Sequence, residues 1–324
     1  DLVDIRTDNP SATNTEIYTS LNRNIYRFEF SGFDGDGKPI ISNFVPIKIG
    51  FSTTGVNWRW AIYPSLYTNG VPLIFTQNTI SLRQISILQN NIGTYSTPDC
   101  DLIVWGANTL STTGDWANKG LIGNMLVDSS GNVYTCFSGR LALDGSTTDG
   151  TGVGFRRMVL GPTGSPTNPL DWTQESIIKG INDGGTDVGP FVGTGDVVNC
   201  RGFEYWAIDE SDIVNGEPTF YISDEDRHIV LRLRHNGGTS STASDWTVEH
   251  IMGTNGTAGD VNGTGTASQL NAPRLPYIEG DYVYIPCRTS HKVKRFDKTT
   301  LVLEDWRGGG EYGSLTLQTE GKKY

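Results

Sequence analysis

No apolar stretch in the 324-residue sequence approaches the roughly 18 residues that a membrane-spanning helix needs. Basic residues are also in deficit: 25 basic against 36 acidic side chains give a formal net charge of −11. Because a general nucleic-acid binder needs a basic surface for phosphate, this charge argues against such a partner. No charged-then-apolar leader precedes Asp1, which predicts a mature or trimmed form. We therefore expect that the protein neither inserts into a membrane nor binds nucleic acid.

Cysteine is scarce, and no CxxC or His-x-Cys pairing suggests a zinc site. The four cysteines are Cys100, Cys136, Cys200 and Cys287. Two states stay open: buried single thiols, or one or two long-range disulfides in an exported protein. The sequence also lacks a Gly-x-Ser-x-Gly elbow and a Gly-Lys-Ser/Thr phosphate loop. It therefore gives no support to nucleophilic or phosphate-loop chemistry, and we expect no cofactor.

Glycine, in contrast, is abundant at 40 residues, and Ser, Thr, Asn and Asp surround it. Apolar residues make up only 36% of the chain and occur in short runs. Brief apolar stretches between dense turn-forming residues predict many short strands rather than long helices. The sequence is therefore expected to fold as an all-β protein.

A tryptophan recurs along the chain, four times in an Asp-Trp pair and once in an Asn-Trp pair. The five positions are Trp58, Trp116, Trp172, Trp246 and Trp306. They lie 58, 56, 74 and 60 residues apart, and each interval holds about four apolar strands. Four antiparallel strands are the content of one β-propeller blade. We interpret these tryptophans mainly as packing between blades.

The two ends of the chain are expected to complete the same scheme. Strands are predicted at 25–30, 39–44 and 46–51, and another at 312–319. Joining them would form one blade shared between the N- and C-termini and close the ring. The prediction is a single propeller domain over 1–324 with five blades, and the alternative is a propeller with six or seven blades.

The C-terminal half resembles the NHL repeat, a type of propeller blade. In 253–297 the resemblance lies in a Gly-rich linker, the approach SQLNAP, a Tyr-Val-Tyr strand and a polar turn into KVKRF. In 218–236, Asp224 and Arg227-His228-Ile229 stand where that family carries its Asp and its Asn-x-Arg-Ile. A fainter copy is GNVYTCFSGR at 131–140. The resemblance implies an NHL-type propeller, and the composition is similar to that of phage or bacterial surface propellers.

The sharpest metal candidate is the run Asp34-Gly-Asp36-Gly-Lys38. A calcium loop of the EF-hand type needs an oxygen ligand where Lys38 stands. A tight hairpin turn accounts for the same residues, since Asp-Gly favours the positive φ angles of such turns. We predict a turn and no metal site.

His228 and His291 occupy corresponding turns of consecutive predicted blades, beside Arg227 and Lys292 respectively. One hypothesis is that Arg227 and both histidines contact an anionic or sugar ligand on a shared loop surface. The interpretation that we favour makes them ordinary polar turn residues of the repeat.

One route to catalysis is a carboxylate pair, because glycoside hydrolysis needs an acid and a base about 5–9 Å apart. Glu204 and Asp209 are the catalytic candidates if the chain is an enzyme. Their neighbours Tyr205 and Trp206 could form a platform for a sugar, or an inner-strand core. Trp60, which follows Arg59, is a further ligand-binding candidate outside the repeating tryptophans.

The function that these observations favour is a non-enzymatic binding or structural module of a cell surface or virion. It would engage a glycan or a protein through propeller loops, and could act as a homo-oligomer or assembly component. The alternative is a polysaccharide-active hydrolase or lyase with a site at the propeller axis. An intracellular NHL-type scaffold is a third, less favoured, hypothesis.

Overall fold

The computed structural model describes most of the C-terminal half and the strands of the N-terminal half. The described ranges are 4–5, 15–21, 24–36, 38–48, 58–68, 71–78, 85–90, 100–105, 121–139, 152–165, 171–183, 186–188, 205–239 and 245–308. These residues form strands and turns, including the 3-10 turn η3 (Gly265–Ala267), and no α-helix occurs among them. The predicted all-β class is confirmed.

Five antiparallel sheets follow one another along the chain. The first contains β1 (Asp4–Ile5), β2 (Thr15–Leu21), β3 (Asn24–Phe33) and β4 (Pro39–Lys48). The second contains β5 (Trp58–Thr68), β6 (Val71–Asn78), β7 (Ile85–Asn90) and β8 (Cys100–Trp105). The third contains β9 (Leu121–Val127), β10 (Val133–Gly139), β11 (Gly152–Leu160), β12 (Trp172–Asp183) and the short β13 (Thr186–Val188).

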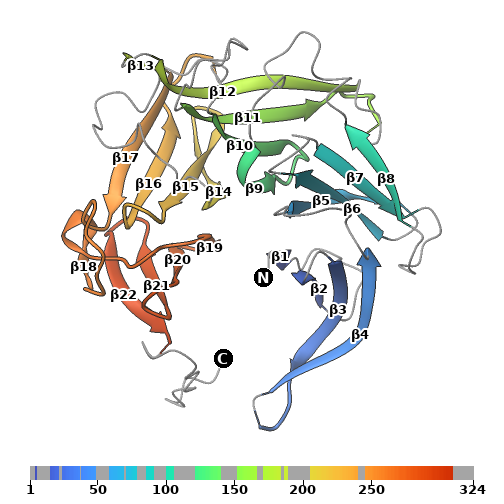
Figure 1. Ribbon diagram of the computed structural model, residues 1–324, viewed down its shortest axis with the longest axis horizontal. Helices are drawn as coiled ribbons and strands as arrows, with labels where there is room; N and C mark the ends of the chain where they lie inside the picture. The colour runs from blue at the N-terminus through green and yellow to red at the C-terminus, as the bar shows by residue number, and fades with distance from the viewer. Residues whose placement is uncertain are drawn as a thin grey trace.

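The last two sheets come from the C-terminal half. The fourth contains β14 (Tyr205–Val214), β15 (Glu217–Asp224), β16 (Ile229–His235) and β17 (Trp246–Met252). The fifth contains β18 (Gly263–Thr264), β19 (Tyr277–Glu279), β20 (Tyr282–Cys287), β21 (Lys292–Asp297) and β22 (Val302–Arg307). Figure 1 shows the five sheets around a common centre, with β9, β14 and β19 near it and β12, β17 and β22 outside. The fold is therefore β-propeller-like.

The predicted sharing of one blade between the termini is not found in the described part of the chain. The first sheet takes all four of its strands from the N-terminal segment, and the fifth takes all of its strands from 263–307. β2 supplies the strand that the sequence prediction missed, and β4 merges two predicted strands. The strand predicted at 312–319 lies outside the described residues.

The Asp-Trp pair has a local structural role at two of its positions. Trp172 and Trp246 each begin the fourth strand of a sheet and are buried. The preceding carboxylates accept hydrogen bonds from the loop before the strand. Asp171 Oδ2 accepts from the Ser165 amide at 2.7 Å, and Asp245 Oδ2 accepts from the Thr239 amide at 2.8 Å. The aspartate carboxylate thus joins the two ends of the loop, and the tryptophan is the first residue of the strand that follows.

The pairs that contain Trp58 and Trp306 do not occupy this place. Trp58 begins β5, the first strand of its sheet, and Trp306 lies next to the end of β22. Asp305 binds lysine side chains of β21 rather than a loop amide. Trp116 lies outside the described residues. The regular spacing in the sequence therefore combines tryptophans with different structural roles.

Aromatic and aliphatic side chains fill the spaces between neighbouring sheets. One cluster joins the third and fourth sheets, where Tyr134 packs against Trp206 and Phe220 with ring centroids 6.3 and 5.3 Å apart. A second cluster joins the fourth and fifth sheets, with Tyr221 against Phe296 at 6.0 Å. Burying large rings on both faces of the fourth sheet stabilises it between its neighbours.

Candidate functional site

The turns that hold His228 and His291 are equivalent, as the sequence predicted. The two histidines have positive φ values of 62° and 53°. A Cβ added to Gly253 would collide with the His228 carbonyl oxygen, and one added to Gly308 with the His291 carbonyl oxygen. The same close approach of a glycine therefore recurs in consecutive sheets.

His228 is engaged by the scaffold itself. Its Nδ1 accepts a hydrogen bond from the Ala272 amide at 3.1 Å, which fixes the ring against the connection between β17 and β19. The Arg227 amide donates to Asp224 Oδ1 at 3.1 Å, and so closes the turn. His291 is exposed. These contacts agree with a structural role for Arg227 and His228.

The sequence candidates on β14 split between the two faces of that strand. Trp206 has no exposed surface and packs between the third and fourth sheets, so it offers no face to a ligand. Tyr205 points the other way, 8% exposed, with the Arg274 guanidinium 5.3 Å from its ring centre. Arg274 also pairs with Glu225 at 3.1 Å. Trp60 lies in β5, where only the backbone is described.

The carboxylate pair is not assembled in the part of the chain that the structure describes. Glu204 lies outside that part. Asp209 is 2% exposed, and its Oδ2 accepts a hydrogen bond from Lys298 Nζ at 2.8 Å. Its Oδ1 accepts from the Ser211 hydroxyl at 2.6 Å. Both oxygens are thus held by neighbouring groups, and Asp209 acts as a tie between the fourth and fifth sheets.

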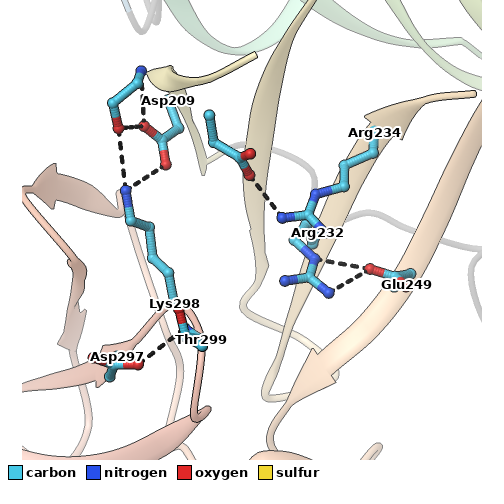
Figure 2. Close-up of polar contacts among 9 residues, drawn as sticks. Asp209, Arg232, Arg234, Glu249, Asp297, Lys298 and Thr299 are labelled. Carbon is cyan, nitrogen blue, oxygen red and sulfur yellow. Dashed lines mark hydrogen bonds and ion pairs between the residues drawn. The ribbon is translucent and has the colours of Figure 1, made fainter. Parts of the chain in front are cut away.

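Asp209 belongs to a polar region between these two sheets, shown in Figure 2. We call it the polar wedge. Its members are Asp209, Asp212, Tyr221, Arg232, Arg234, Glu249 and Lys298. Every charged member has an oppositely charged partner. Besides the Asp209–Lys298 pair, Arg232 Nη2 lies 2.7 Å from Glu249 Oε2, and Arg234 Nη2 lies 2.7 Å from Asp212 Oδ2.

Two members of the polar wedge have displaced pKa values. Burial alone would raise the pKa of Asp212, but the hydrogen bond from Arg234 and the positive charges of Arg234 and Lys298 outweigh it and hold that pKa below its ordinary value. Burial raises the pKa of Tyr221 to about 12, with opposing contributions from Arg232 and Asp209. At neutral pH Asp212 is therefore ionised and Tyr221 is a neutral phenol.

A second surface lies on the opposite face of the fifth sheet. In β20, Val283 and Ile285 point into the core beside the fourth sheet, so the alternating Tyr282 and Tyr284 point away from it. We call this surface the aromatic face. It consists of Tyr277, Tyr282, Tyr284, Arg295, Trp306 and Arg307.

The aromatic face is partly open to solvent. Tyr277 is 60% exposed, and Tyr282, Tyr284 and Trp306 are half-buried. Tyr284 and Trp306 meet edge to face with ring centroids 5.0 Å apart. Arg295 lies over the Tyr282 ring at 4.4 Å, and Arg307 lies over Trp306 at 4.8 Å. Flat rings are thus presented together with guanidinium donors.

Sequence analysis missed this surface, although a signal was present. The run Tyr-Val-Tyr puts two tyrosines on one face of a strand, because side chains alternate. Strand pairing then places Tyr277 opposite Tyr284 and Arg295 opposite Tyr284 on the other side. Tyr277 and Arg295 become neighbours of Tyr284 only through the pairing register of their strands, and this register could not be read from the sequence.

No group of three or more potential metal ligands occurs within the described residues. The Asp34 carboxylate is used in its own turn, where Oδ1 accepts from the amides of Asp36 and Lys38 at 2.9 and 2.8 Å. The predicted hairpin turn between β3 and β4 is confirmed. Within the same part of the chain, no helix is long and apolar enough to cross a membrane.

Cys287 is the cysteine whose side chain the structure describes. Its thiol is free and 1% exposed, and burial raises its pKa to about 11. Cys100 and Cys136 lie in β8 and β10, where only the backbone is described, and Cys200 lies outside the described residues.

Neither a protein-family model nor a curated protein matches the sequence. Two solved structures from Bacteroides thetaiotaomicron share the fold. One, a protein named as a candidate phosphatase, is 13% identical with a TM-score of 0.51 over 95% of this chain and 59% of its own. The other, an auxiliary nutrient binding protein, is 15% identical with a TM-score of 0.50 over 95% of this chain and 57% of its own. The chain thus spans less than two thirds of either protein, and identities this low show the fold alone.

Proposed function

We propose that the chain is a non-enzymatic binding module of a cell surface or virion that engages a glycan through the aromatic face. The scaffold would be a five-bladed propeller with NHL-type blades in its C-terminal half. Five consecutive sheets support that count, and no described strand joins the first sheet to the fifth. The single observation that carries the proposal is the exposed ring of Tyr277 beside the Tyr284–Trp306 pair.

Aromatic rings suit a sugar because their faces are apolar and carry partial negative charge, which favours packing against sugar C–H groups. Arg295 and Arg307 stand beside these rings with N–H donors for sugar hydroxyls. The B. thetaiotaomicron neighbour that bears the name of a nutrient binding protein is in keeping with a binding role. The enzyme alternative has less support, because Asp209 is held by Lys298 and Ser211.

The test is binding of the full chain to an array of neutral and acidic oligosaccharides, followed by titration calorimetry with the best ligand. Replacing Trp306 or Tyr277 with alanine is expected to weaken that binding about tenfold. Phe44, which is 58% exposed on β4, gives a matched control, and Phe44→Ala should bind as the wild type does.

Failure of the wild-type chain to retain any oligosaccharide would overturn the proposal. Unchanged affinity in both Trp306→Ala and Tyr277→Ala would do the same. Release of new reducing ends during incubation would instead establish the polysaccharide-active enzyme.

A further inference from the structure

One cation of the aromatic face has no carboxylate partner within the described residues. Arg295 Nε donates to Glu304 Oε1 at 2.5 Å, so the charge of this arginine is balanced. Arg307 is exposed, and its one side-chain hydrogen bond within the described chain joins Nη1 to the Trp306 carbonyl oxygen at 2.9 Å. A guanidinium has five N–H donors and is always charged in proteins. Arg307 therefore presents a positive charge and unused donors beside the Trp306 ring, 4.8 Å from its centre.

The backbone fixes the position of Arg307 from two sides. Arg307 pairs with Val293 of β21, and a register shift before it makes Trp306 the extra residue of a β-bulge. Bulges re-aim side chains, and here Trp306 is turned onto the aromatic face, against Tyr284. Gly308 follows with a φ of +102°, and a Cβ there would collide with the backbone of the turn before β21. The place of the guanidinium is thus set by strand pairing and by the residue that follows it.

Strand pairing arranges the charges of this face in three rows. Paired residues lie on the same face of a sheet, and alternate residues of a strand return to that face about 7 Å further on. The first row contains Glu279, Tyr282 and Asp297, the second Tyr277, Tyr284, Arg295 and Glu304, and the third Pro286, Val293 and Arg307. The first row thus carries two carboxylates, the second one balanced ion pair, and the third one cation. The face is acidic at one end and basic at the other, with about 14 Å between the end rows.

The net charge of the whole chain does not override this local pattern. The formal net charge is −11, but charges further apart than the Debye length, about 8 Å at physiological ionic strength, are largely screened. The other charges at this end of β21 and β22 are balanced on the opposite face of the sheet. There two lysines, Lys292 and Lys294, pair with two carboxylates, Asp260 and Asp305. Arg307 is therefore the excess charge at the basic end.

The three rows indicate which kind of glycan fits. A neutral oligosaccharide could pack on the rings but would leave Arg307 without a counter-ion. An oligosaccharide with a carboxylate on every unit would bring negative charge against Glu279 and Asp297. A single carboxylate at one end avoids both problems, because a planar carboxylate can pair with a guanidinium through two parallel hydrogen bonds. The neutral units then lie over the rings of the second row.

We propose that the aromatic face selects a glycan whose terminal sugar carries a carboxylate, and that Arg307 binds this carboxylate. The inference rests on the glycan binding proposed for the same face and adds the class and orientation of the ligand. The charged end lies at Arg307, the neutral units lie over Tyr284 and Tyr277, and no charge of the ligand approaches Glu279.

The test compares cellobiose, lactose and maltose with the forms in which the primary alcohol of the non-reducing sugar is oxidised to a carboxylate. Titration calorimetry of the full chain is expected to give at least one acidic form a Kd about tenfold lower than that of its neutral counterpart. Arg307→Gln keeps an N–H donor but removes the charge, and should bring the two Kd values together. Arg288→Gln removes the charge of an arginine outside the aromatic face, 58% exposed, and should keep the wild-type preference.

Trigalacturonate, which has a carboxylate on every unit, tests the order of charges along the face. It is expected to bind more weakly than the acidic form of lactose. Glu279→Gln removes a negative charge from the first row and should lower the Kd of trigalacturonate about threefold, the size of effect typical of exposed charges.

Equal affinities for the acidic and neutral forms in all three pairs would overturn this inference and leave the proposed glycan binding intact. A preference that survives in Arg307→Gln would also overturn it, as would trigalacturonate binding more tightly than every acidic disaccharide. If none of these probes binds, the inference fails, whereas the proposed glycan binding is decided separately by the oligosaccharide array.

Discussion

Lys298 Nζ lies 2.8 Å from Asp209 Oδ2 and joins the fifth sheet to the innermost strand of the fourth. The two residues are 89 positions apart in the sequence. The carboxylate is 2% exposed and the lysine side chain 14%, so the pair lies where water screens it weakly. It is therefore a structural tie between two sheets that also share the apolar cluster around Tyr221 and Phe296.

Lys298→Met is expected to destabilise the protein by about 2–4 kcal/mol, because it leaves the Asp209 carboxylate buried without its cation. Urea unfolding at neutral pH measures the loss. Lys38→Met, at an exposed lysine of the β3–β4 turn, serves as the control and should unfold like the wild type. The double variant Lys298→Met, Asp209→Leu should regain part of the loss, because no charge then remains buried. Wild-type stability in Lys298→Met would contradict the structural role of this pair.

Local features of the fold were predictable because short-range chemistry determines them. The Asp34 turn needs only an aspartate two and four residues before the amides that it binds. Asp171 and Asp245 close their loops over six residues each. Strand content follows from the alternation of apolar runs and turn formers. The four-stranded first sheet, which the sequence analysis had expected to borrow a strand from the C-terminus, and the role of Trp306 could not be derived in this way, because both depend on which strands pair.

The candidate site was harder to predict for a related reason. The adjacent residues Tyr205 and Trp206 look like one aromatic platform in the sequence, but side chains on a strand alternate. Trp206 therefore enters the core beside the third sheet, while Tyr205 contacts Arg274. Asp209 was singled out as a catalytic candidate for an enzyme, but its partner Lys298 comes from a turn of another sheet. Only the three-dimensional arrangement shows that its charge is neutralised.

Gly253 offers a test of the repeated histidine turn. Its φ is +86°, and a Cβ would meet the His228 carbonyl oxygen, a backbone atom that cannot move away easily. Gly253→Ala should therefore lose about 1–2 kcal/mol for the left-handed backbone and roughly 1–3 kcal/mol more for the collision. Gly256 has a φ of +70° with open space around it, so Gly256→Ala should show the backbone cost alone. Chemical unfolding of the two variants decides the matter, and equal losses would refute the close approach.

The network around Lys294 should make stability depend on pH in the acid range. Lys294 has no exposed surface, and its Nζ lies 2.6 Å from Asp260 Oδ1 and 2.7 Å from Asp305 Oδ1. Burial acts to raise the pKa of both carboxyls, but hydrogen bonds from Lys292 and Lys294 outweigh it and hold each pKa below 3.8. A carboxyl whose pKa is lower in the folded state stabilises that state above its unfolded pKa. The stabilisation is lost as pH falls from 3.8 through the folded pKa values.

Lys294→Met removes one cation from both carboxyls, so their folded pKa values should move back towards the ordinary value. The urea midpoint should then fall less steeply than that of the wild type as pH drops below about 4. Lys292→Met, whose side chain is 18% exposed, is the second variant if Lys294→Met does not fold, and should flatten the same part of the curve. Lys38→Met should keep the wild-type slope. Acid profiles that stay as steep in both network variants as in the wild type would show that these lysines do not control the two carboxyls.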